Sequence, residues 1–326
     1  MSFIVLDAAA VERLLPMREC IEVMARAFVD LERGDVVQPL RSIFVPPDTQ
    51  TAMAWMPAYR AKPRPAFGMK VLCVVPDNPG RGLDTHQGQV LVADGETGQL
   101  RGVLDASTVT GIRTAAVSAL ATRLLAREDA RVLAIIGTGA QARRHIESIP
   151  LVRRIEQIHV AGREPAHAQR LVWDMRKACA CPIDAVADAR TAVRGADIIV
   201  TATSSPTPVI ERTWLAAGVH VNAVGASRPT HRELDVDTIA AALLFTDRRE
   251  SLENEAGDYR LAREEGRITR SPRELGELLA GKVEGRTSAE QVTIFRSLGL
   301  AVEDLVAAEH VLTRAGEQGL GITVDF

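Results

Sequence analysis

The segment RVLAIIGTGAQARRHIESI, residues 131–149, constrains the fold of this chain more than any other feature. An apolar run of the kind found in buried strands leads directly into Gly137-Thr138-Gly139, and a helix-forming stretch follows at once. A Gly-x-Gly-x-x-Gly/Ala pattern in this strand, turn and helix context is typical of a dinucleotide-binding Rossmann unit. The first glycine allows the tight turn, the second lets backbone approach a pyrophosphate, and the small Ala142 lets the helix pack on the strand. We therefore predict that a dinucleotide binds here; the alternative is a glycine turn that binds nothing.

The pattern on either side of this turn predicts two domains. From about residue 108, apolar strands alternate with helical stretches, which indicates a doubly wound parallel sheet covered by helices on both faces. Residues 40–105 instead contain strand-like runs broken by Pro, Gly and short turns, as in hairpins. Helical periodicity predicts one helix over residues 8–33 and another near the C-terminal end, closed by glycine. The polar stretch 248–290 is expected to be exposed helix and loop whose charges need no functional explanation.

Composition narrows the class of partner. The chain has 326 residues, 46% of them apolar, and its 39 basic residues are scattered among 42 acidic ones, so we expect a globular protein that does not bind nucleic acid. No apolar run is long enough to cross a bilayer, and no secretory leader is recognisable, so we expect no membrane association and a cytoplasmic location. The spacing of the four cysteines predicts neither a disulfide framework nor a metal site.

The strand after the glycine-rich turn bears on the choice of dinucleotide. An acidic residue at its end would bind the adenosine ribose hydroxyls, but the sequence there is IHVAGREP, with Gly162 at the expected position and Arg163 next. A guanidinium without a neighbouring carboxylate suits a 2′-phosphate, so we predict NADP(H) as the preferred cofactor and NAD(H) as the alternative. Arg163 as an ordinary loop residue, with Glu164 binding the ribose, is the other interpretation.

Three cations in or beside apolar runs suggest an anion site. Arg41, Lys70 and Arg113 occur in PLRSIFVP, AFGMKVLCVV and TGIRTAAVSA. Burying one such charge alone is costly, whereas three that converge on a carboxylate would be explained. Each alone could equally be a surface residue whose stem lies on apolar atoms.

Several long segments resemble one family, the ornithine cyclodeaminase/mu-crystallin family, over almost the whole chain. They are MPAY (56–59), GMKVLCVVPDNP (68–79), THQGQVLVADGETGQLRGVLD (85–105), TGIRTAAVSALATRLLAR (110–127), GTGAQA (137–142), VGASRPTHRELD (224–235) and TIFRSLGLAVEDLVAAEHV (293–311). The resemblance implies an α+β substrate-binding and dimerisation domain over residues 1–112 and 304–326, a Rossmann domain over 113–303, and a homodimer.

The resemblance also implies site residues. Arg41, Lys70 and Arg113 match carboxylate-binding cations, Lys70 and Arg113 are the catalytic candidates, and Leu298 matches a substrate-pocket position. Cofactor contacts are expected at Thr85, Arg113, Gly137, Gly139, Ala140, Gln141, Arg163, Thr203, Val224, Gly225, Ala226, Ser227 and Ser297. Met53 and Met56 are expected to line an adaptable pocket with Leu298.

One departure from the family pattern bears on the reaction. Cyclodeaminases and related alanine dehydrogenases carry a catalytic Asp where this chain has Ser227, and His231 stands where they have Lys. An unassisted hydroxyl is a poor general base at neutral pH. The GASRP form resembles the ketimine reductases, so we predict NADPH-dependent reduction of a cyclic ketimine carboxylate, such as Δ1-pyrroline-2-carboxylate or Δ1-piperideine-2-carboxylate, to L-proline or L-pipecolate.

The proton for this reaction has two possible sources: the substrate enters as an iminium, or Lys70 donates the proton. Two other functions stay open at this stage. One is an ornithine cyclodeaminase or amino-acid dehydrogenase with a stand-in acid such as Asp235 or Asp237. The other is a protein that holds NADPH and a small hydrophobic anion without useful turnover, as the hormone-binding role of mu-crystallin suggests.

Overall fold

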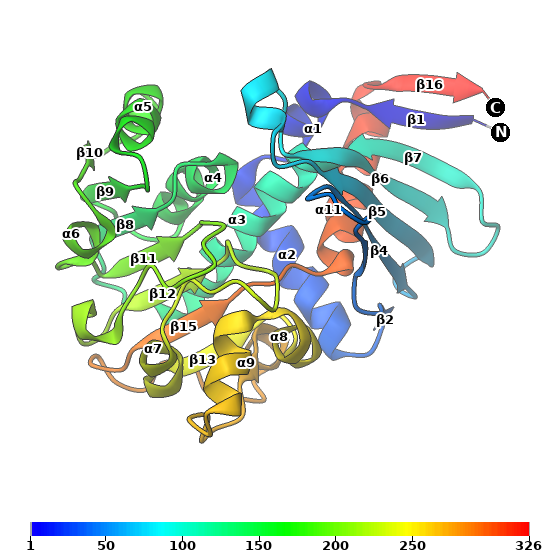
Figure 1. Cartoon of the computed structure of the whole chain (residues 1–326). Coiled ribbons are helices and arrows are strands. Elements are labelled where there is room, and N and C mark those ends of the chain that lie inside the picture. Colours follow the sequence, from blue (N-terminus) through cyan, green and yellow to red (C-terminus); the bar gives the residue numbers. More distant parts are fainter. Residues whose placement is uncertain (1, 326) are drawn as a thin grey trace. The chain divides into compact units, whose positions relative to one another are not determined.

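The computed structural model describes residues 2–325, and these divide into two compact units. Unit 1 comprises the described residues of Met1–Arg113 and Gly299–Phe326, and unit 2 is Thr114–Leu298. The chain thus leaves unit 1 within one helix, α3, and returns to it just before the last helix, α11 (Figure 1). Unit 2 lies within the range 113–303 expected for the Rossmann domain.

Unit 1 is built on a mostly antiparallel sheet in the order β16-β1-β7-β6-β5-β4-β2, with β3 paired to β4. The first and last strands of the chain, β1 and β16, lie side by side at one edge (Figure 1). The strands are β1 (Ser2–Leu6), β2 (Val36–Val37), β3 (Ser42–Phe44), β4 (Ala52–Arg60), β5 (Ala66–Val74), β6 (His86–Asp94), β7 (Leu100–Asp105) and β16 (Ile322–Asp325).

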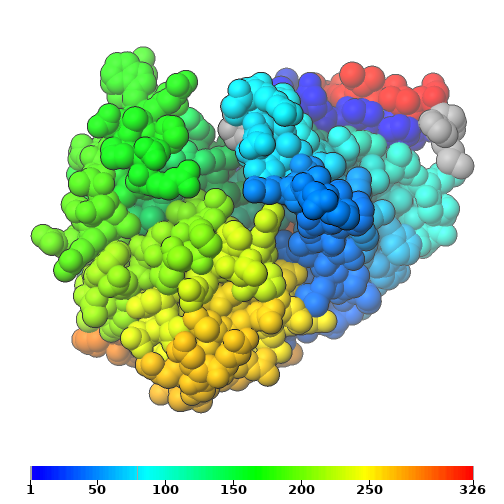
Figure 2. Space-filling view, in the orientation of Figure 1, coloured from blue at the N-terminus to red at the C-terminus, as the bar shows by residue number. Residues whose placement is uncertain are grey.

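Helices cover one face of this sheet and leave the other exposed. Helix α11 contacts β4, β5 and β6 as well as α2. Along β4 and β5 every second residue is buried, as the two-residue period of a strand requires. The segment that carries β3 lies at the surface (Figure 2, blue). The helices of unit 1 are α1 (Ala8–Leu14), α2 (Met17–Glu32), η1 (Asn78–Arg81) and α11 (Ala301–Gln318), together with the first part of α3 (Ala106–Leu125).

Unit 2 is a parallel sheet in the order β10-β9-β8-β11-β12-β15-β13-β14. Successive strands lie on one side of β8 up to β10 and then on its other side from β11, so the order reverses between β8 and β11. This is the switch point at which doubly wound folds bind ligands. The strands are β8 (Val132–Ile136), β9 (Gln157–Ala161), β10 (Ile183–Ala185), β11 (Ile198–Thr201), β12 (His220–Ala223), β13 (Leu243–Thr246), β14 (Arg273–Glu274) and β15 (Thr293–Arg296).

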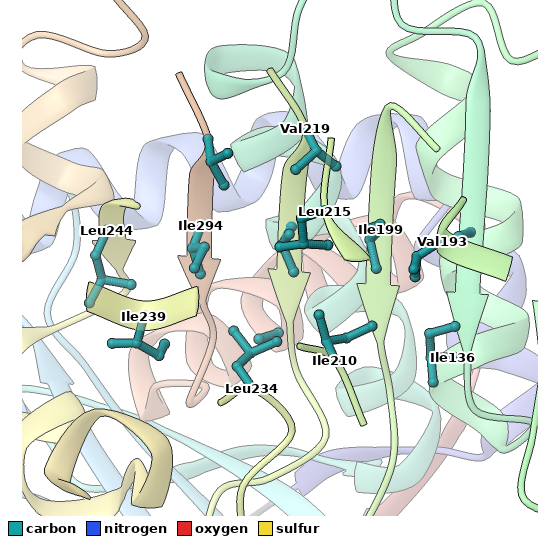
Figure 3. Close-up of a cluster of buried hydrophobic side chains, with 14 of the residues drawn as sticks. Ile136, Val193, Ile199, Ile210, Leu215, Val219, Leu234, Ile239, Leu244 and Ile294 are labelled. Carbon is teal, nitrogen blue, oxygen red and sulfur yellow. The ribbon is translucent and has the colours of Figure 1, made fainter. Parts of the chain in front are cut away.

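The core of unit 2 explains the continuous apolar runs of its sequence. Every residue of β11, β12, β13 and β15 is buried, because elements pack on both faces of the sheet. Figure 3 shows Ile136, Ile199 and Ile294 from three strands packed with side chains from the connecting segments. The helices are α4 (Ala140–Ser148), η2 (Ile149–Leu151), α5 (Pro165–Met175), α6 (Ala189–Val193), η3 (Arg212–Trp214), α7 (Val236–Ala241), α8 (Arg249–Glu255), α9 (Gly257–Glu264) and α10 (Leu275–Leu279).

The α/β class and the doubly wound sheet are confirmed, and two local predictions are wrong. The helix expected over 8–33 is two helices, because Leu15 and Pro16 separate α1 from α2 and proline disfavours a helical residue before it. The stretch 248–290 is not merely exposed, since Asp258 is 1% exposed and ion-paired. None of the helices within residues 2–325 combines the length and the apolar character needed to span a bilayer.

Candidate functional site

The glycine-rich turn lies between β8 and α4, as the sequence predicts. Gly137 has φ +128°, and a Cβ there would collide with the carbonyl oxygen of Ala202 in the loop after β11, so only glycine fits. Gly139 caps α4, and it and Ala140 are exposed, with open space where a Cβ would be at Gly139. The first turn of α4 therefore presents accessible backbone N–H groups, which suits a pyrophosphate.

Gln141 adds an independent sign of a missing partner. Its Oε1 is buried and accepts no hydrogen bond from any described residue. A buried acceptor without a donor is costly, so a group that supplies one would be stabilised there. A dinucleotide fits the residues of this turn for both reasons.

The residue directly after β9, where an acid would bind the adenosine ribose hydroxyls, is not acidic. Gly162 follows the strand, and Arg163 is exposed and forms no hydrogen bond or ion pair with any residue in the described range. Glu164 is the N-cap residue of α5, without a side-chain capping bond. An unpaired guanidinium at this place is available to an anionic ligand.

The loops after β11 and β12 carry further predicted cofactor contacts, Thr203 and the stretch 224–227. Both loops are bound by the carboxylate of Glu233, which is fully buried. Burial raises the pKa of this carboxyl, while Arg296 and the surrounding donors oppose that effect. Glu233 is not recognisable from the sequence, because it lies between charged residues, Arg232 and Asp235, in the RELD segment.

Arg296, at the end of β15, binds the backbone at the start of the loop after β12. It is completely buried, and its Nε lies 3.0 and 3.1 Å from the two carboxylate oxygens of Asp258. Its other donors reach the carbonyl oxygens of Ala223, Ala226 and Ser297. This arginine therefore fixes the backbone where β12 ends and where Ser297 begins the return to unit 1.

The predicted cations form one cluster on unit 1. Lys70 points from the buried face of β5, with its Nζ 2.7 Å from Asp304 Oδ2, and Arg113 Nε lies 3.0 Å from Asp304 Oδ1. Arg113 also pairs with Glu303, and the four side chains are at most 4% exposed. Arg41 joins the cluster by donating to the carbonyl oxygen of Gly299 at 2.8 Å.

Gly299 is the point where the two arginines meet. Its φ is +77°, and a Cβ there would lie 2.6 Å from Arg113 Nη1. The absence of a side chain lets Arg113 and Arg41 approach the same stretch of backbone before α11. Arg41, Lys70 and Arg113 are thus gathered with the carboxylates of Glu303 and Asp304 in one cluster of charged side chains.

The electrostatics of Lys70 follow from this cluster. Burial lowers the pKa of its ammonium to about 8, with Arg113 and Arg41 acting in the same direction and Asp304 opposing them. For Arg113, burial alone would lower the pKa, but Asp304 and Glu303 outweigh it and the guanidinium pKa is raised. The pKa of Asp304 is lowered because its two cations outweigh its burial. Lys70 is thus a cation whose charge can be lost in mildly alkaline solution.

The remaining predicted site residues lie in different units or on different faces of a strand. Thr85, like Arg113, belongs to unit 1, on the segment before β6, whereas the other predicted cofactor contacts belong to unit 2. Met53 and Met56 lie on opposite faces of β4, with Met53 42% exposed and Met56 6% exposed, so the prediction that they line one pocket is wrong. Strand side chains alternate, and residues three apart cannot share a face. Within residues 2–325 no group of metal-binding side chains is assembled.

The family model and the most similar known sequences point to the same family. A model of the ornithine cyclodeaminase/mu-crystallin family matches residues 1–319. A Δ1-pyrroline-2-carboxylate reductase of Bacillus cereus is 36% identical over 326 residues, covering 99% of this chain and all of that protein. The ketimine reductase mu-crystallin of Mus musculus is 35% identical over 278 residues, covering 85% of each chain.

Solved structures agree over the full length. The Δ1-pyrroline-2-carboxylate reductase of Thermococcus litoralis, in complex with NADH and L-proline, superposes with a TM-score of 0.93 at 33% identity, covering 99% of this chain and all of that one. An archaeal alanine dehydrogenase dimer with bound NAD has a TM-score of 0.92 at 29% identity, with both chains fully covered.

Proposed function

Because the chain belongs to the ornithine cyclodeaminase/mu-crystallin family, we propose that it reduces cyclic ketimine carboxylates with NADPH. Its general class, an oxidoreductase that reduces imines with a nicotinamide cofactor, follows from the family and from relatives more than 30% identical over most of the chain. The proposed substrates are Δ1-pyrroline-2-carboxylate and Δ1-piperideine-2-carboxylate, giving L-proline and L-pipecolate.

The observation that carries the proposal is the cation cluster of unit 1. Arg41, Lys70 and Arg113 converge there, and Asp304 and Glu303 hold Lys70 and Arg113 in place. A substrate carboxylate would suit this site, because charge-assisted hydrogen bonds to guanidinium and ammonium groups are strong and directional. A planar cyclic imine that carries one carboxylate is a ligand of this kind.

The residues of unit 2 support a dinucleotide, and Arg163 supports its phosphorylated form. The accessible start of α4 would hold the pyrophosphate, and the unpartnered Gln141 Oε1 would accept a hydrogen bond from a donor group elsewhere on the dinucleotide. The unpaired Arg163 beside Gly162 would bind a 2′-phosphate. A relative of known structure binds NADH, so the preference for NADPH over NADH is the part of the proposal to be measured.

In the proposed mechanism, the bound reduced nicotinamide supplies the hydride that the imine carbon accepts. Arg41 and Arg113 hold the substrate carboxylate and so fix the orientation of the ring. Lys70, whose pKa is lowered, has two alternative roles: it donates a proton from Nζ to the imine nitrogen, or it only stabilises the carboxylate of a substrate that already enters as the iminium. Asp304, bound to both Lys70 and Arg113, keeps these cations in place.

The acids that a cyclodeaminase would need are engaged elsewhere. Ser227 stands at the position of the catalytic Asp. Asp235 accepts hydrogen bonds from the backbone N–H groups of Thr238 and Arg212 as a helix cap, and Asp237 pairs with Arg267 at 2.6 Å. Neither acid is available as a general base in this arrangement, which favours imine reduction.

Cofactor consumption with both imine ring sizes tests the proposal. The purified protein should oxidise NADPH faster than NADH in the presence of either imine, and it should release no ammonia from ornithine. Saturable binding of NADPH and imine without any oxidation would indicate a binding protein instead. Ammonia release from ornithine would refute the argument from Ser227.

We also propose that the exposed sheet face of unit 1 forms a homodimer interface. Met53, Trp55, Phe67 and Met69 project from neighbouring strands on this face and are 37–49% exposed. Contiguous apolar surface of this kind marks an interaction site in soluble proteins. The archaeal alanine dehydrogenase of similar fold is a dimer, which supports a second copy of the chain as the occupant.

A further inference from the structure

Glu233 lies between the loops that follow β11 and β12 and binds both. Its Oε1 accepts hydrogen bonds from the N–H of Thr203 at 2.6 Å and from the Thr203 hydroxyl at 2.9 Å. Its Oε2 accepts from the N–H groups of Gly225 at 2.6 Å and of Ala226 at 3.3 Å. All of these partners donate, so the site suits an ionised carboxylate, which has only acceptors.

The backbone of Glu233 is fixed from the other side by the core. Its carbonyl oxygen accepts hydrogen bonds from the N–H groups of Val209 at 2.8 Å and Ile210 at 3.1 Å. The next residue, Leu234, is fully buried in the hydrophobic cluster near Ile210 (Figure 3). The carboxylate is therefore held at a fixed point, and the two loops are held to it.

These loops occupy the place where a parallel sheet binds its ligand. They leave the carboxyl ends of β11 and β12, which are adjacent, and β11 in turn lies beside β8 with its glycine-rich turn. Contact between the loops is close, because a Cβ on Gly225 would collide with the backbone of Thr203 and lie 2.7 Å from Glu233 Oε1. Ligands of doubly wound folds bind at this edge, near the switch point.

We propose that Glu233 is a positioning residue, whose carboxylate fixes the loop of Thr203 and the loop of residues 224–227 in the arrangement that receives the dinucleotide. The inference rests on the proposed function only in taking these loops as cofactor contacts. If the carboxylate is lost, the N–H groups of Thr203, Gly225 and Ala226 have no acceptor, and buried unpaired donors are costly. The loops would then separate or turn toward water, and cofactor affinity would fall.

Replacing Glu233 by Gln tests this with little change in volume. The amide keeps one oxygen, but its NH₂ group must face either Thr203 or the pair Gly225 and Ala226, so donors oppose donors at one loop. We expect the Kd for NADPH, measured by fluorescence titration without substrate, to rise about ten- to hundredfold. The KM for the imine at saturating NADPH should not change, because the cations that bind it belong to unit 1.

Asp197 provides a matched control in the same unit. Its Oδ2 accepts hydrogen bonds from the N–H groups of Arg131 at 2.8 Å and Val132 at 3.0 Å, at the amino ends of β8 and β11. Asp197→Asn should lower Tm while leaving the Kd for NADPH unchanged. If Glu233→Gln behaves in the same way, with lower Tm and unaltered Kd, then Glu233 is only structural and the inference is overturned.

Hydrogen exchange of the unmodified protein gives a test that does not depend on a variant folding. Without cofactor, the amides of Thr203 and Gly225 should exchange slowly because Glu233 binds them, whereas that of the exposed Arg228 should exchange quickly. Equal, rapid exchange would overturn the inference alone. Failure of the wild-type protein to bind any nicotinamide would instead overturn the proposed function, and this inference with it.

Discussion

The substitution Asp304→Asn would test whether the protonation of Lys70 controls activity. In the folded protein the pKa of Lys70 is lowered from 10.5 to about 8, because burial outweighs the opposing effect of Asp304. The two charged groups are 2.7 Å apart and almost completely buried. Asparagine has the same shape, and its oxygen can still accept from Arg113 Nε, but its amide presents N–H groups to the ammonium. The variant removes the group that retains the proton on Lys70.

The expected size of the effect follows from this geometry. An opposite charge within about 4–6 Å shifts a pKa by roughly 1–3 units, so the pKa of Lys70 in the variant should fall to roughly 5–7. Only the protonated ammonium can bind a carboxylate or donate a proton, so activity is present below the pKa and lost as the pH rises through it. The alkaline limb of kcat/KM should therefore move to lower pH, and activity at neutral pH should decline.

The assay is kcat/KM for the imine as a function of pH, followed by NADPH oxidation. The imine has its own titration, but it is the same for wild type and variant, so a difference between the two profiles reports the protein. Glu303→Gln is the matched control, because Glu303 pairs with Arg113, whose guanidinium does not titrate in this range. A folded Asp304→Asn protein with normal NADPH affinity and an unmoved alkaline limb would refute the assignment of that limb to Lys70.

Three further predictions concern the cofactor phosphate, the cation cluster and the apolar face. Arg163→Ala should weaken NADPH binding about ten- to hundredfold, the value of a charge-assisted contact, while NADH binding stays the same; equal weakening of both would contradict the 2′-phosphate argument. Gly299→Ala places a Cβ 2.6 Å from Arg113 Nη1 at a left-handed position, so kcat/KM for the imine should fall by about tenfold or more, and an unchanged kcat/KM would contradict the role given to Arg113. Phe67→Glu should convert a dimer to monomers in light scattering, whereas Trp173→Glu, at a 64% exposed position of α5, should not; a monomeric wild type would refute the interface.

Local sequence patterns predicted the parts of the fold that depend on neighbouring residues. The glycine-rich turn and the helix that begins at Ala140 are where the sequence places them, because turn, cap and strand are all encoded within a few residues. The break between α1 and α2 is also encoded locally, in Pro16, although the apolar period over residues 8–33 continues across it and by itself predicts one helix.

The cations of unit 1 could be recognised in the sequence, because a charge within an apolar run is costly to bury unless it has a partner or a ligand. Their carboxylate partners were not, since Asp304 is 191 residues from Arg113 in the chain. Glu303 and Asp304 also lie in the first turn of α11, where acidic residues are expected simply from the helix dipole. Because the helix dipole already accounts for acidic residues at this position, the sequence alone did not indicate that they pair with Arg113.

The error over Met53 and Met56 shows how strand periodicity could have improved the site prediction. Both methionines lie in a run that was correctly read as a strand, and the two-residue period alone puts odd and even positions on opposite faces. Applied along β4, the same period puts Met53 and Trp55 on the exposed face. It puts Met56 on the buried face, where Met56 pairs with Lys70 of the next strand. Under the proposed function, the strand would therefore have two roles, with its exposed apolar face meeting a second copy of the chain and its buried face lying toward the cation cluster. A substitution at an odd position should accordingly change assembly, and one at an even position should change catalysis.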